Sequence, residues 1–369
     1  MPTLRGPLPD YPWDAMAPYA ARAKEHPGGA LDLSVGSPVD PTPAPIGEAL
    51  AAATDAHAYP ATAGAPRLRE AIADWYLRRR GVTVSPAAVL PTIGSKELVA
   101  LLPFLLGIGA GEAVVFPRIA YPSYEMGAAM VGADPVASDD PAEWPDRTAL
   151  VWLNSPANPD GRVLDVPELR AAVERARELG AVIVGDECYA ELGWEGRWRD
   201  ERIPSILDPR VTGEDHRGVL GIYSLSKQSN LAGYRAAFLA GDPELVSGLL
   251  NVRKHAGLMV PAPVQAAMVA ALADEAHVEV QRERYRARRE TLLPALEAAG
   301  YRLDGSEAGL YLWVTRGVDA WQSVADFAEL GIIVGPGHFY GDHSPNHVRV
   351  ALTASDETVA EAARRLGSA

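Results

Sequence analysis

The chain has 369 residues, of which 48% are hydrophobic and 22% are charged, and these proportions exclude a disordered or fibrous protein. Because 48 acidic residues outnumber 34 lysines and arginines, giving a formal net charge of -14, we expect no nucleic-acid partner. With a single cysteine, Cys188, no signal peptide in residues 1–13 and no apolar stretch long enough to span a bilayer, we expect a cytoplasmic protein that binds no membrane.

The order of elements along the chain predicts an α/β protein. A Pro-rich turn segment at 36–45 is expected to join an N-terminal arm, residues 1–45, to the body. Within residues 46–245 apolar runs alternate with helical patterns. Helices are expected at 98–106 and 166–179, the second with Gly180 as its C-cap, and strands at 113–116, 149–153, 181–185, 219–223 and 236–240. Such alternation predicts a mostly parallel sheet covered by helices on both faces.

The pattern changes after about residue 245. A long charged helix is expected at 274–299, followed by strands at 310–315 and 348–352. Residues 246–369 are therefore expected to form a smaller α+β domain behind a large domain at 46–245.

Polar and aromatic side chains follow four of the expected strands. They are Tyr121 after the first, Asn158 after the second, Asp186 and Tyr189 after the third, and Ser224, Ser226, Lys227 and Arg235 after the fourth. Because ligands of open α/β sheets bind outside the carboxyl ends of the strands, these residues predict one site at one edge of the sheet.

The residue types in this set match the needs of pyridoxal phosphate. Lys227, one of only four lysines in the chain, would form a Schiff base with the aldehyde of this cofactor. Asp186 would keep the ring nitrogen protonated, so that the ring can take up the electrons of a carbanion. Tyr121 would stack on the ring, although alone it would be taken for a core tyrosine. No metal site is expected.

The remaining contacts would hold the phenolic oxygen and the phosphate. Asn158 and Tyr189 would donate hydrogen bonds to the phenolic oxygen, although an Asn-Pro turn explains Asn158 equally well. The phosphate would lie at the start of a helix, with side-chain contacts from the segment after the fourth strand. These phosphate-binding candidates are the backbone N–H groups of Gly94, Ser95 and Lys96 and the side chains of Ser224, Ser226 and Arg235.

Motifs in a fixed order carry a family resemblance over about residues 31–366. They read GSPVDPTP, YPATAGAPRLREAIADWY, GSKE, AYPSY, NSPANPDG, DECY, SLSKQSNLAGYR and HVRVAL. Together they resemble the fold type I, class I/II pyridoxal-phosphate aminotransferases, in which the lysine is followed eight residues later by an arginine, as Lys227 is by Arg235. PDYPWD, LDLSVGSPVDP and VLPTIGSKELVA further resemble the N-succinyldiaminopimelate aminotransferase branch.

This resemblance implies a seven-stranded sheet, a smaller domain and a homodimer with shared active sites. Tyr59 would reach the phosphate of the partner subunit's cofactor, Arg349 would grip the substrate α-carboxylate, and Gly36 would let the backbone approach the substrate. The implied reaction transfers an amino group from N-succinyl-LL-2,6-diaminopimelate to 2-oxoglutarate, in lysine biosynthesis. The family often has threonine where this chain has Asp160, which we expect to make an equivalent capping contact.

Other functions remain open at this point. The same motifs suit a class I aminotransferase for aspartate, aromatic or other amino acids, and also a pyridoxal-phosphate C–S β-lyase. A non-catalytic, ligand-sensing regulator is less expected, because fewer than forty residues precede the aminotransferase-like body. A nucleotide-binding dehydrogenase is disfavoured because no G-x-G-x-x-G follows a first strand.

Overall fold

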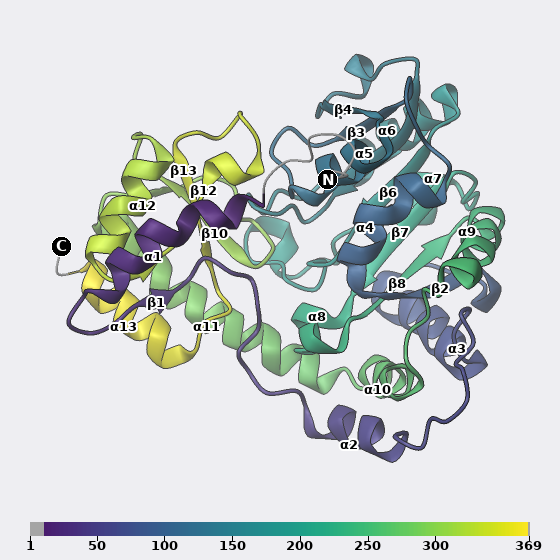
Figure 1. Cartoon of the computed structure of the whole chain (residues 1–369), viewed down its shortest axis with the longest axis horizontal. Helices are drawn as coiled ribbons and strands as arrows, with labels where there is room; N and C mark the ends of the chain where they lie inside the picture. The colour runs from purple at the N-terminus through teal and green to yellow at the C-terminus, as the bar shows by residue number, and fades with distance from the viewer. Residues whose placement is uncertain (1–10, 368–369) are drawn as a thin grey trace, which may run out of the picture.

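The computed structural model describes residues 11–367. Residues 1–10, which include the start of the expected arm and the first two residues of PDYPWD, lie outside this range. A seven-stranded sheet in the order β2-β8-β7-β6-β5-β3-β4 forms the centre of the larger part of the molecule (Figure 1). Its strands are β2 (Val89–Ile93), β3 (Ala113–Phe116), β4 (Asp134–Ala137), β5 (Thr148–Asn154), β6 (Val182–Asp186), β7 (Val219–Ser224) and β8 (Ala236–Gly241).

Only β8 runs against its neighbours in this sheet. It pairs antiparallel with β2 and β7, whereas the pairs from β7 across to β4 are parallel. The predicted mostly parallel sheet is therefore confirmed. The strands β2 and β4 were not predicted, and both lie at the edges of the sheet. Each contains a proline, Pro91 or Pro135, and an edge strand tolerates the missing N–H group because one side of it has no partner strand.

Helices cover both faces of the sheet. One face packs on α4 (Gly94–Leu105), α5 (Ser123–Val131) and α9 (Pro243–Ala256), and the other on α3 (Pro66–Trp75), α6 (Val166–Leu179) and α10 (Ala262–Ala273). Successive residues of β5 point to opposite faces of the sheet. Leu150 and Trp152 pack with α4, α5 and α9, and Val151 and Leu153 pack on the face covered by α3, α6 and α10. This alternation is what a strand buried on both faces requires.

The expected helix at 166–179 forms as α6, with clear signals at both ends. Asp165 and Glu168 make a capping box at its start, and Gly180 ends it with a left-handed φ of 68°. The side chains of the capping box satisfy N–H groups that have no partner inside the helix. Glycine suits the last position because the left-handed region costs it no steric strain.

The smaller part of the molecule combines segments from the N-terminal and C-terminal parts of the described chain. An antiparallel sheet in the order β12-β13-β10-β9 packs with helices, and β1 from the N-terminal segment pairs in parallel with β11. The strands are β1 (Leu31–Asp32), β9 (Arg302–Leu303), β10 (Tyr311–Thr315), β11 (Ile332–Ile333), β12 (Gly335–Pro336) and β13 (His347–Ala351). The helices are α1 (Ala17–Lys24), α11 (Ala276–Ala298), α12 (Ala320–Glu329) and α13 (Asp356–Leu366). The expected smaller α+β domain is thus present.

Two helices that extend beyond residue 245, α9 and α10, belong with the large sheet. Val246 and Leu249 of α9, and Met268 and Leu272 of α10, are buried in the clusters that cover that sheet. We therefore propose that the large domain ends between α10 and α11, rather than at residue 245. The helix α2 (Ala44–Ala52) packs against α10 on this side of the molecule. Among the helices within residues 11–367, none combines the length and apolar character needed to cross a membrane.

Candidate active site

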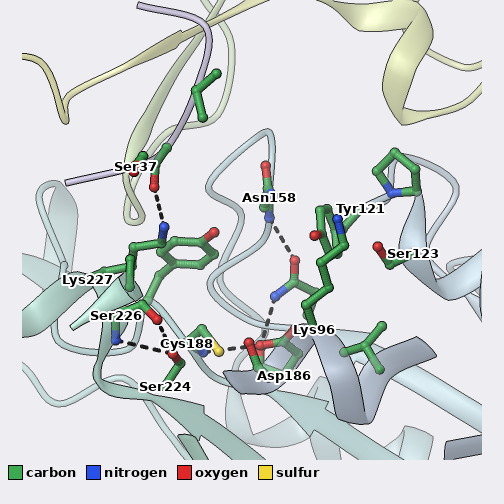
Figure 2. A pocket seen from close by; sticks show the side chains of 18 of the residues that line it. Ser37, Lys96, Tyr121, Ser123, Asn158, Asp186, Cys188, Ser224, Ser226 and Lys227 are labelled. Carbon is green, nitrogen blue, oxygen red and sulfur yellow. Dashed lines mark hydrogen bonds between the residues drawn. The ribbon is translucent and has the colours of Figure 1, made fainter. Parts of the chain in front are cut away.

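A cavity of about 500 Å³ lies at the carboxyl ends of three neighbouring parallel strands (Figure 2). Asn154, Asp186 and Ser224 are the last residues of β5, β6 and β7, and all three line the cavity. Of the predicted site residues, only Gly94 and Tyr59 are absent from its wall. Those present are Gly36, Ser95, Lys96, Tyr121, Asn158, Asp186, Tyr189, Ser224, Ser226, Lys227, Arg235 and Arg349. Its size and its position at a sheet edge suit a small-molecule site.

Asp186 lies at the base of the cavity and is hydrogen-bonded on both oxygens. Its Oδ2 accepts from the Tyr124 hydroxyl at 2.8 Å, and its Oδ1 accepts from the backbone N–H of Cys188 at 3.3 Å. Burial raises the pKa of this carboxyl above its ordinary value. A buried acid that faces a cavity can hold a protonated ring nitrogen by charge and hydrogen bonding. Tyr124, which positions this acid, was not among the predicted site residues.

Lys227 lies in the single turn of α8 (Leu225–Gln228), directly after β7. The Ser224 side chain caps this turn by accepting from the backbone N–H of Ser226 at 3.2 Å. Lys227 Nζ donates to the backbone oxygen of Gly36, which also lines the cavity. Burial lowers the pKa of the amine, and the nearby cations of Arg349 and Arg235 lower it further. A lysine with a lowered pKa is the form that attacks carbonyl groups and accepts protons near neutral pH.

The start of α4 and the loop after α8 form a hollow that suits an anion. Gly94 opens α4 with a left-handed φ of 74°, and its N–H donates to the backbone oxygen of Arg235 at 2.9 Å. A Cβ at Gly94 would collide with the Arg235 guanidinium, so glycine lets the arginine pack against the helix start. Ser95, Ser224 and Ser226 line the same side of the cavity. N–H groups of a helix start and a nearby guanidinium are the usual ligands of phosphate. The Gly94 N–H, which was predicted to bind phosphate, is paired with Arg235 instead.

Arg349 on β13 is a buried cation on the opposite wall. Its Nη1 donates to Asn158 Oδ1 at 2.9 Å and its Nη2 to the backbone oxygen of Ser34 at 2.6 Å. Its Cζ lies 4.0 Å from the centre of the Tyr311 ring. Arg349 has no carboxylate partner among residues 11–367, and its Nε donates to no acceptor there. A buried guanidinium without a carboxylate partner is suited to binding a carboxylate from a substrate.

Two asparagines connect Arg349 to Asp186. The backbone N–H of Asn158 donates to Asn154 Oδ1 at 2.8 Å, and Asn154 Nδ2 donates to the backbone oxygen of Asp186 at 2.9 Å (Figure 2). Asp160 makes a turn contact, accepting from the backbone N–H of Arg162 at 3.3 Å. It therefore does not cap a helix, and burial raises the pKa of its carboxyl.

Four tyrosines and a lysine complete the wall. The Tyr189 hydroxyl lies 3.4 Å from the hydroxyl of Tyr311. Lys96 Nζ lies 5.8 Å from the centre of the Tyr121 ring and 5.6 Å from that of Tyr11. Sequence reasoning missed Tyr311, which stands in no pattern that separates it from ordinary strand residues. Asn154 directly follows the expected strand at 149–153, but it was given no role beside Asn158. Tyr124 follows the expected strand at 113–116 together with Tyr121, and this position is the signal that could have assigned it a role.

Tyr59 is the predicted residue that lies away from the cavity. Its side chain is 94% exposed, the highest value among the large hydrophobic residues found at the surface. Its contact with the phosphate of the partner subunit's cofactor stays a prediction.

The residues at this site fit pyridoxal phosphate. They provide a lysine amine, a buried carboxylate on the ring-nitrogen side, and a helix start with an arginine for the phosphate. Within residues 11–367 there is no group of three or more histidine, cysteine, aspartate or glutamate side chains that could hold a metal ion.

Comparison with known proteins places this geometry in context. The sequence model for "Aminotransferase class I and II" matches residues 29–366. The chain is 56% identical to the 4-dedimethylamino-4-oxo-anhydrotetracycline transaminase OxyQ of Streptomyces rimosus, over 97% of this chain and 99% of the relative. It is 55% identical to the protein named "Probable aminotransferase Rv1178" of Mycobacterium tuberculosis, over 97% of this chain and 85% of the relative. The solved structure of N-succinyldiaminopimelate aminotransferase from Mycobacterium tuberculosis superposes with a TM-score of 0.86, at 28% identity and 96% coverage of both chains.

Proposed function

The chain belongs to the class I and II aminotransferases, and we propose that it transfers the amino group of N-succinyl-LL-2,6-diaminopimelate to 2-oxoglutarate. This reaction would be a step of lysine biosynthesis in the cytoplasm. The observation that carries the proposal is the pair of cations, Arg349 and Lys96, that remain in the cavity once Lys227 and Arg235 are assigned to the cofactor. Both proposed substrates carry at least two carboxylates. The structural likeness to a succinyldiaminopimelate enzyme adds support.

The enzyme is an aminotransferase that depends on pyridoxal phosphate. When bound, this cofactor supplies an aldehyde for covalent attachment to an amine and a protonated ring that takes up electrons from the substrate α-carbon. The Arg349 fork would bind the substrate α-carboxylate and fix the orientation of the α-carbon. Lys227 Nζ would remove the proton from that carbon and hold it for return. Asp186 Oδ1 and Oδ2 would face the ring nitrogen and keep its proton in place.

Lys96 would bind the distal carboxylate of the substrate. Its backbone lies in the first turn of α4, and its side chain reaches the cavity wall between the rings of Tyr11 and Tyr121. Among residues 11–367, Asp186 is the only aspartate or glutamate in the wall of the cavity, so no other described acid in that wall competes for the Lys96 amine. A carboxylate placed there would gain a charge-assisted hydrogen bond.

A second candidate acceptor is a polycyclic ketone. The relative with 56% identity is named for a tetracycline precursor that carries an oxo group. A polycyclic ketone needs a flat apolar entrance rather than a second cation. Tyr11, Trp13 and Tyr121 line the cavity together with Val35 and Met126, and such rings could stack on a fused-ring substrate. Other amino-acid donors, or C–S β-elimination, require no residue beyond those already described.

We further propose that the protein acts as a homodimer in which Tyr59 completes the phosphate site of the partner subunit. The near-complete exposure of this tyrosine in the single chain supports the assignment.

The test of the substrate is a set of half-reactions followed by the visible absorption of the bound cofactor. The donors are succinyldiaminopimelate, glutamate, aspartate and phenylalanine, and each product form is then titrated with 2-oxoglutarate or an oxo-anhydrotetracycline. We expect succinyldiaminopimelate to give the highest second-order rate among the donors. Faster turnover of the polycyclic ketone than of 2-oxoglutarate would support the second candidate. Release of pyruvate from cystathionine without an acceptor would identify a lyase.

Substitution of Lys96 tests the binding of the distal carboxylate. Lys96→Met keeps the backbone N–H of α4 and is expected to raise the KM for donors with a distal carboxylate about 10- to 100-fold, while phenylalanine is unaffected. Lys254→Met is the matched control, because Lys254 is exposed on α9 and does not line the cavity. An equal loss with phenylalanine would show that Lys96 acts on the cofactor instead.

A further inference from the structure

Tyr311 lies on β10, in the wall of the cavity, and touches groups from three other segments. Its side chain is 4% exposed. Its ring packs on the Arg349 guanidinium, with 4.0 Å between Cζ and the ring centre, and its hydroxyl lies 3.4 Å from that of Tyr189. The same residue therefore contacts the proposed carboxylate-binding arginine and the tyrosine assigned to the phenolic oxygen.

The Tyr311 hydroxyl also adjoins the segment that holds the catalytic lysine. A Cβ added to Gly36 would collide with this hydroxyl, so the tyrosine lies directly against the Gly36 backbone. The carbonyl oxygen of Gly36 accepts the hydrogen bond from Lys227 Nζ. Gly36 thus contacts both the phenol and the amine. The close approach of Tyr311 provides a physical reason for glycine at position 36.

The charges around Tyr311 are arranged to couple it with Lys227. Burial alone would raise the pKa of the phenol, but the cations of Arg349 and Lys227 bring it below its ordinary value. In the other direction, Tyr311 raises the pKa of Lys227, opposing burial and the cations of Arg349 and Arg235. The titratable or charged groups that act on Tyr311 or respond to it are Cys188, Tyr189, Lys227, Tyr285, Tyr340 and Arg349.

We propose that Tyr311 is a positioning residue for both reacting groups of this enzyme: its ring orients the Arg349 guanidinium, and its hydroxyl sets the charge state of the Lys227 amine through their shared contact with Gly36. This rests on the proposed role of Lys227 as the base. The ring and the hydroxyl have separate functions, so removing one without the other separates substrate binding from proton transfer.

The titration of Lys227 tests the hydroxyl directly, without substrate or cofactor. The full chain is freed of cofactor and its amines are reductively methylated with 13C, which labels the four lysine side chains and the N-terminal amine. The Lys227 signal is identified by its loss in Lys227→Arg and then followed against pH. Removal of a nearby acidic hydroxyl destabilises the ammonium form, so Tyr311→Phe is expected to lower the Lys227 midpoint by about 0.5 to 1 pH unit.

Tyr340→Phe is the matched control. The Tyr340 ring also lies near Arg349, at 5.0 Å, but its hydroxyl is buried and has no hydrogen-bond partner in the described chain. It should leave the midpoint unchanged. An unshifted midpoint in Tyr311→Phe, or equal shifts in both variants, would overturn the proposal. If Tyr311→Phe does not fold, Gly36→Ala displaces the same hydroxyl and must lower the midpoint in the same direction.

Steady-state kinetics of the holoenzyme test the role of the ring. Tyr311→Phe keeps the ring and should leave the donor KM within about twofold, while the acidic limb of the kcat profile moves to lower pH. Tyr311→Leu also loses the ring contact with Arg349 and should raise the donor KM about tenfold. Equal KM values for the two variants would contradict the positioning of Arg349 by the ring. A failure of the donor predictions above would leave the Lys227 titration unaffected, so the two proposals fail separately.

Discussion

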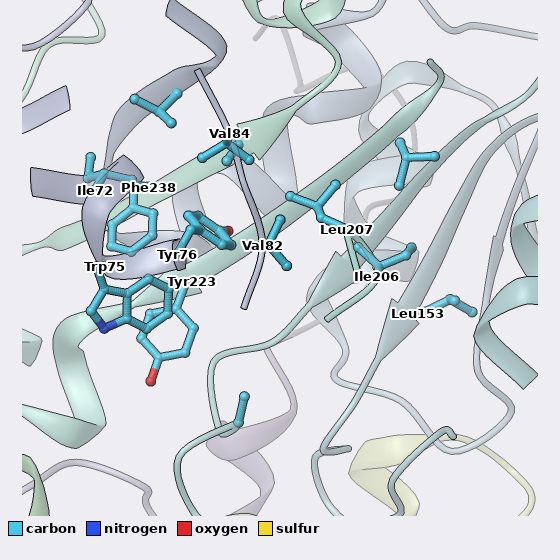
Figure 3. Packing of buried hydrophobic residues seen from close by; sticks show 14 of the residues in the cluster. Ile72, Trp75, Tyr76, Val82, Val84, Leu153, Ile206, Leu207, Tyr223 and Phe238 are labelled. Carbon is cyan, nitrogen blue, oxygen red and sulfur yellow. The ribbon is translucent and has the colours of Figure 1, made fainter. Parts of the chain in front are cut away.

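Tyr223 and Ser224 are neighbours on β7, yet they belong to two regions with opposite physical character. Tyr223 packs in an aromatic cluster, with 4.4 Å between its ring centre and that of Trp75 and 5.8 Å to that of Phe238 (Figure 3). Ser224 faces the cavity and caps the turn that carries Lys227. Burial of apolar surface stabilises the first region, whereas burial of polar groups in the second costs free energy unless they are paired.

The comparison teaches that stability and chemistry depend on different residues of the same strands. In the aromatic cluster the one polar atom of Tyr223 is satisfied, since its hydroxyl donates to Gln228 at 2.6 Å. In the cavity, Lys227 has a lowered pKa and Arg349 has no carboxylate partner among the described residues. Hydrogen bonds from both side chains to backbone oxygens partly compensate for their burial. Substitutions in the two regions should therefore separate loss of folding from loss of function.

The largest effect is expected at Lys227. Lys227→Met removes the amine that binds the cofactor and moves the proton, so kcat should fall about a thousandfold or more. The midpoint of thermal unfolding of the cofactor-free protein should not fall, because the buried amine contributes no apolar packing. In the wild type, borohydride should reduce the C=N bond that joins the cofactor to the lysine amine, so the visible absorption is lost and the cofactor stays covalently bound to one peptide. Recovery of the bound cofactor on a peptide without Lys227 would remove the basis of the site.

The second effect belongs to the aromatic cluster. Trp75→Ala should lower the free energy of unfolding by about 3–5 kcal/mol, because it leaves a cavity beside Tyr223 and Phe238. The donor KM of the fraction that remains folded should not change. Urea denaturation measures the first quantity, and initial rates at low temperature measure the second. A raised KM without a loss of stability would show that the two regions are not separate.

The third effect is expected at Asp186, where both the catalytic rate and the free energy of unfolding should change. Asp186→Asn should lower kcat about a hundredfold, because an amide cannot stabilise a protonated ring nitrogen by charge. Burial raises the pKa of this carboxyl in the folded, cofactor-free protein. Between the unfolded-state value of about 4 and the raised folded value, the folded state binds more protons, so stability declines as pH rises.

We therefore compare the free energy of unfolding of cofactor-free Asp186→Asn with that of the wild type at each pH. The difference should favour the variant more at pH 7 than at pH 4. Urea denaturation at both pH values measures the difference, with Asp134→Asn at an exposed site as the control. A relative gain at the lower pH instead would mean that Asp186 is charged and stabilised in the folded chain.

The smallest effect is expected at Tyr59. Tyr59→Phe removes one hydroxyl from the proposed phosphate site of the partner subunit, and should weaken cofactor binding about 2- to 10-fold. Equilibrium dialysis of the cofactor measures this, and sedimentation shows whether the protein is a dimer. Tyr19→Phe, on α1, serves as the control. Unchanged affinity in a protein that sediments as a dimer would assign Tyr59 no role in the shared site.

Prediction from the sequence succeeded where a pattern was local. Buried central strands appeared as short apolar runs, and Gly180 marked the end of α6. Most candidate site residues follow such strands directly, so they could be placed at one sheet edge. The edge strands β2 and β4 were missed because proline masks a strand pattern, and only the sheet order shows that they lie where proline is tolerated.

The amino-acid sequence by itself determined the alternation of strands and helices, the polar residues that follow the strands, and the single lysine among them. Tertiary structure alone decided that the N-terminal segment pairs with a strand three hundred residues later, and that Gly36, Tyr311 and Arg349 meet around Lys227. The physical reason is distance along the chain. Periodicity and capping are set by neighbours within a few residues, whereas these contacts form only when distant segments bury their surfaces together.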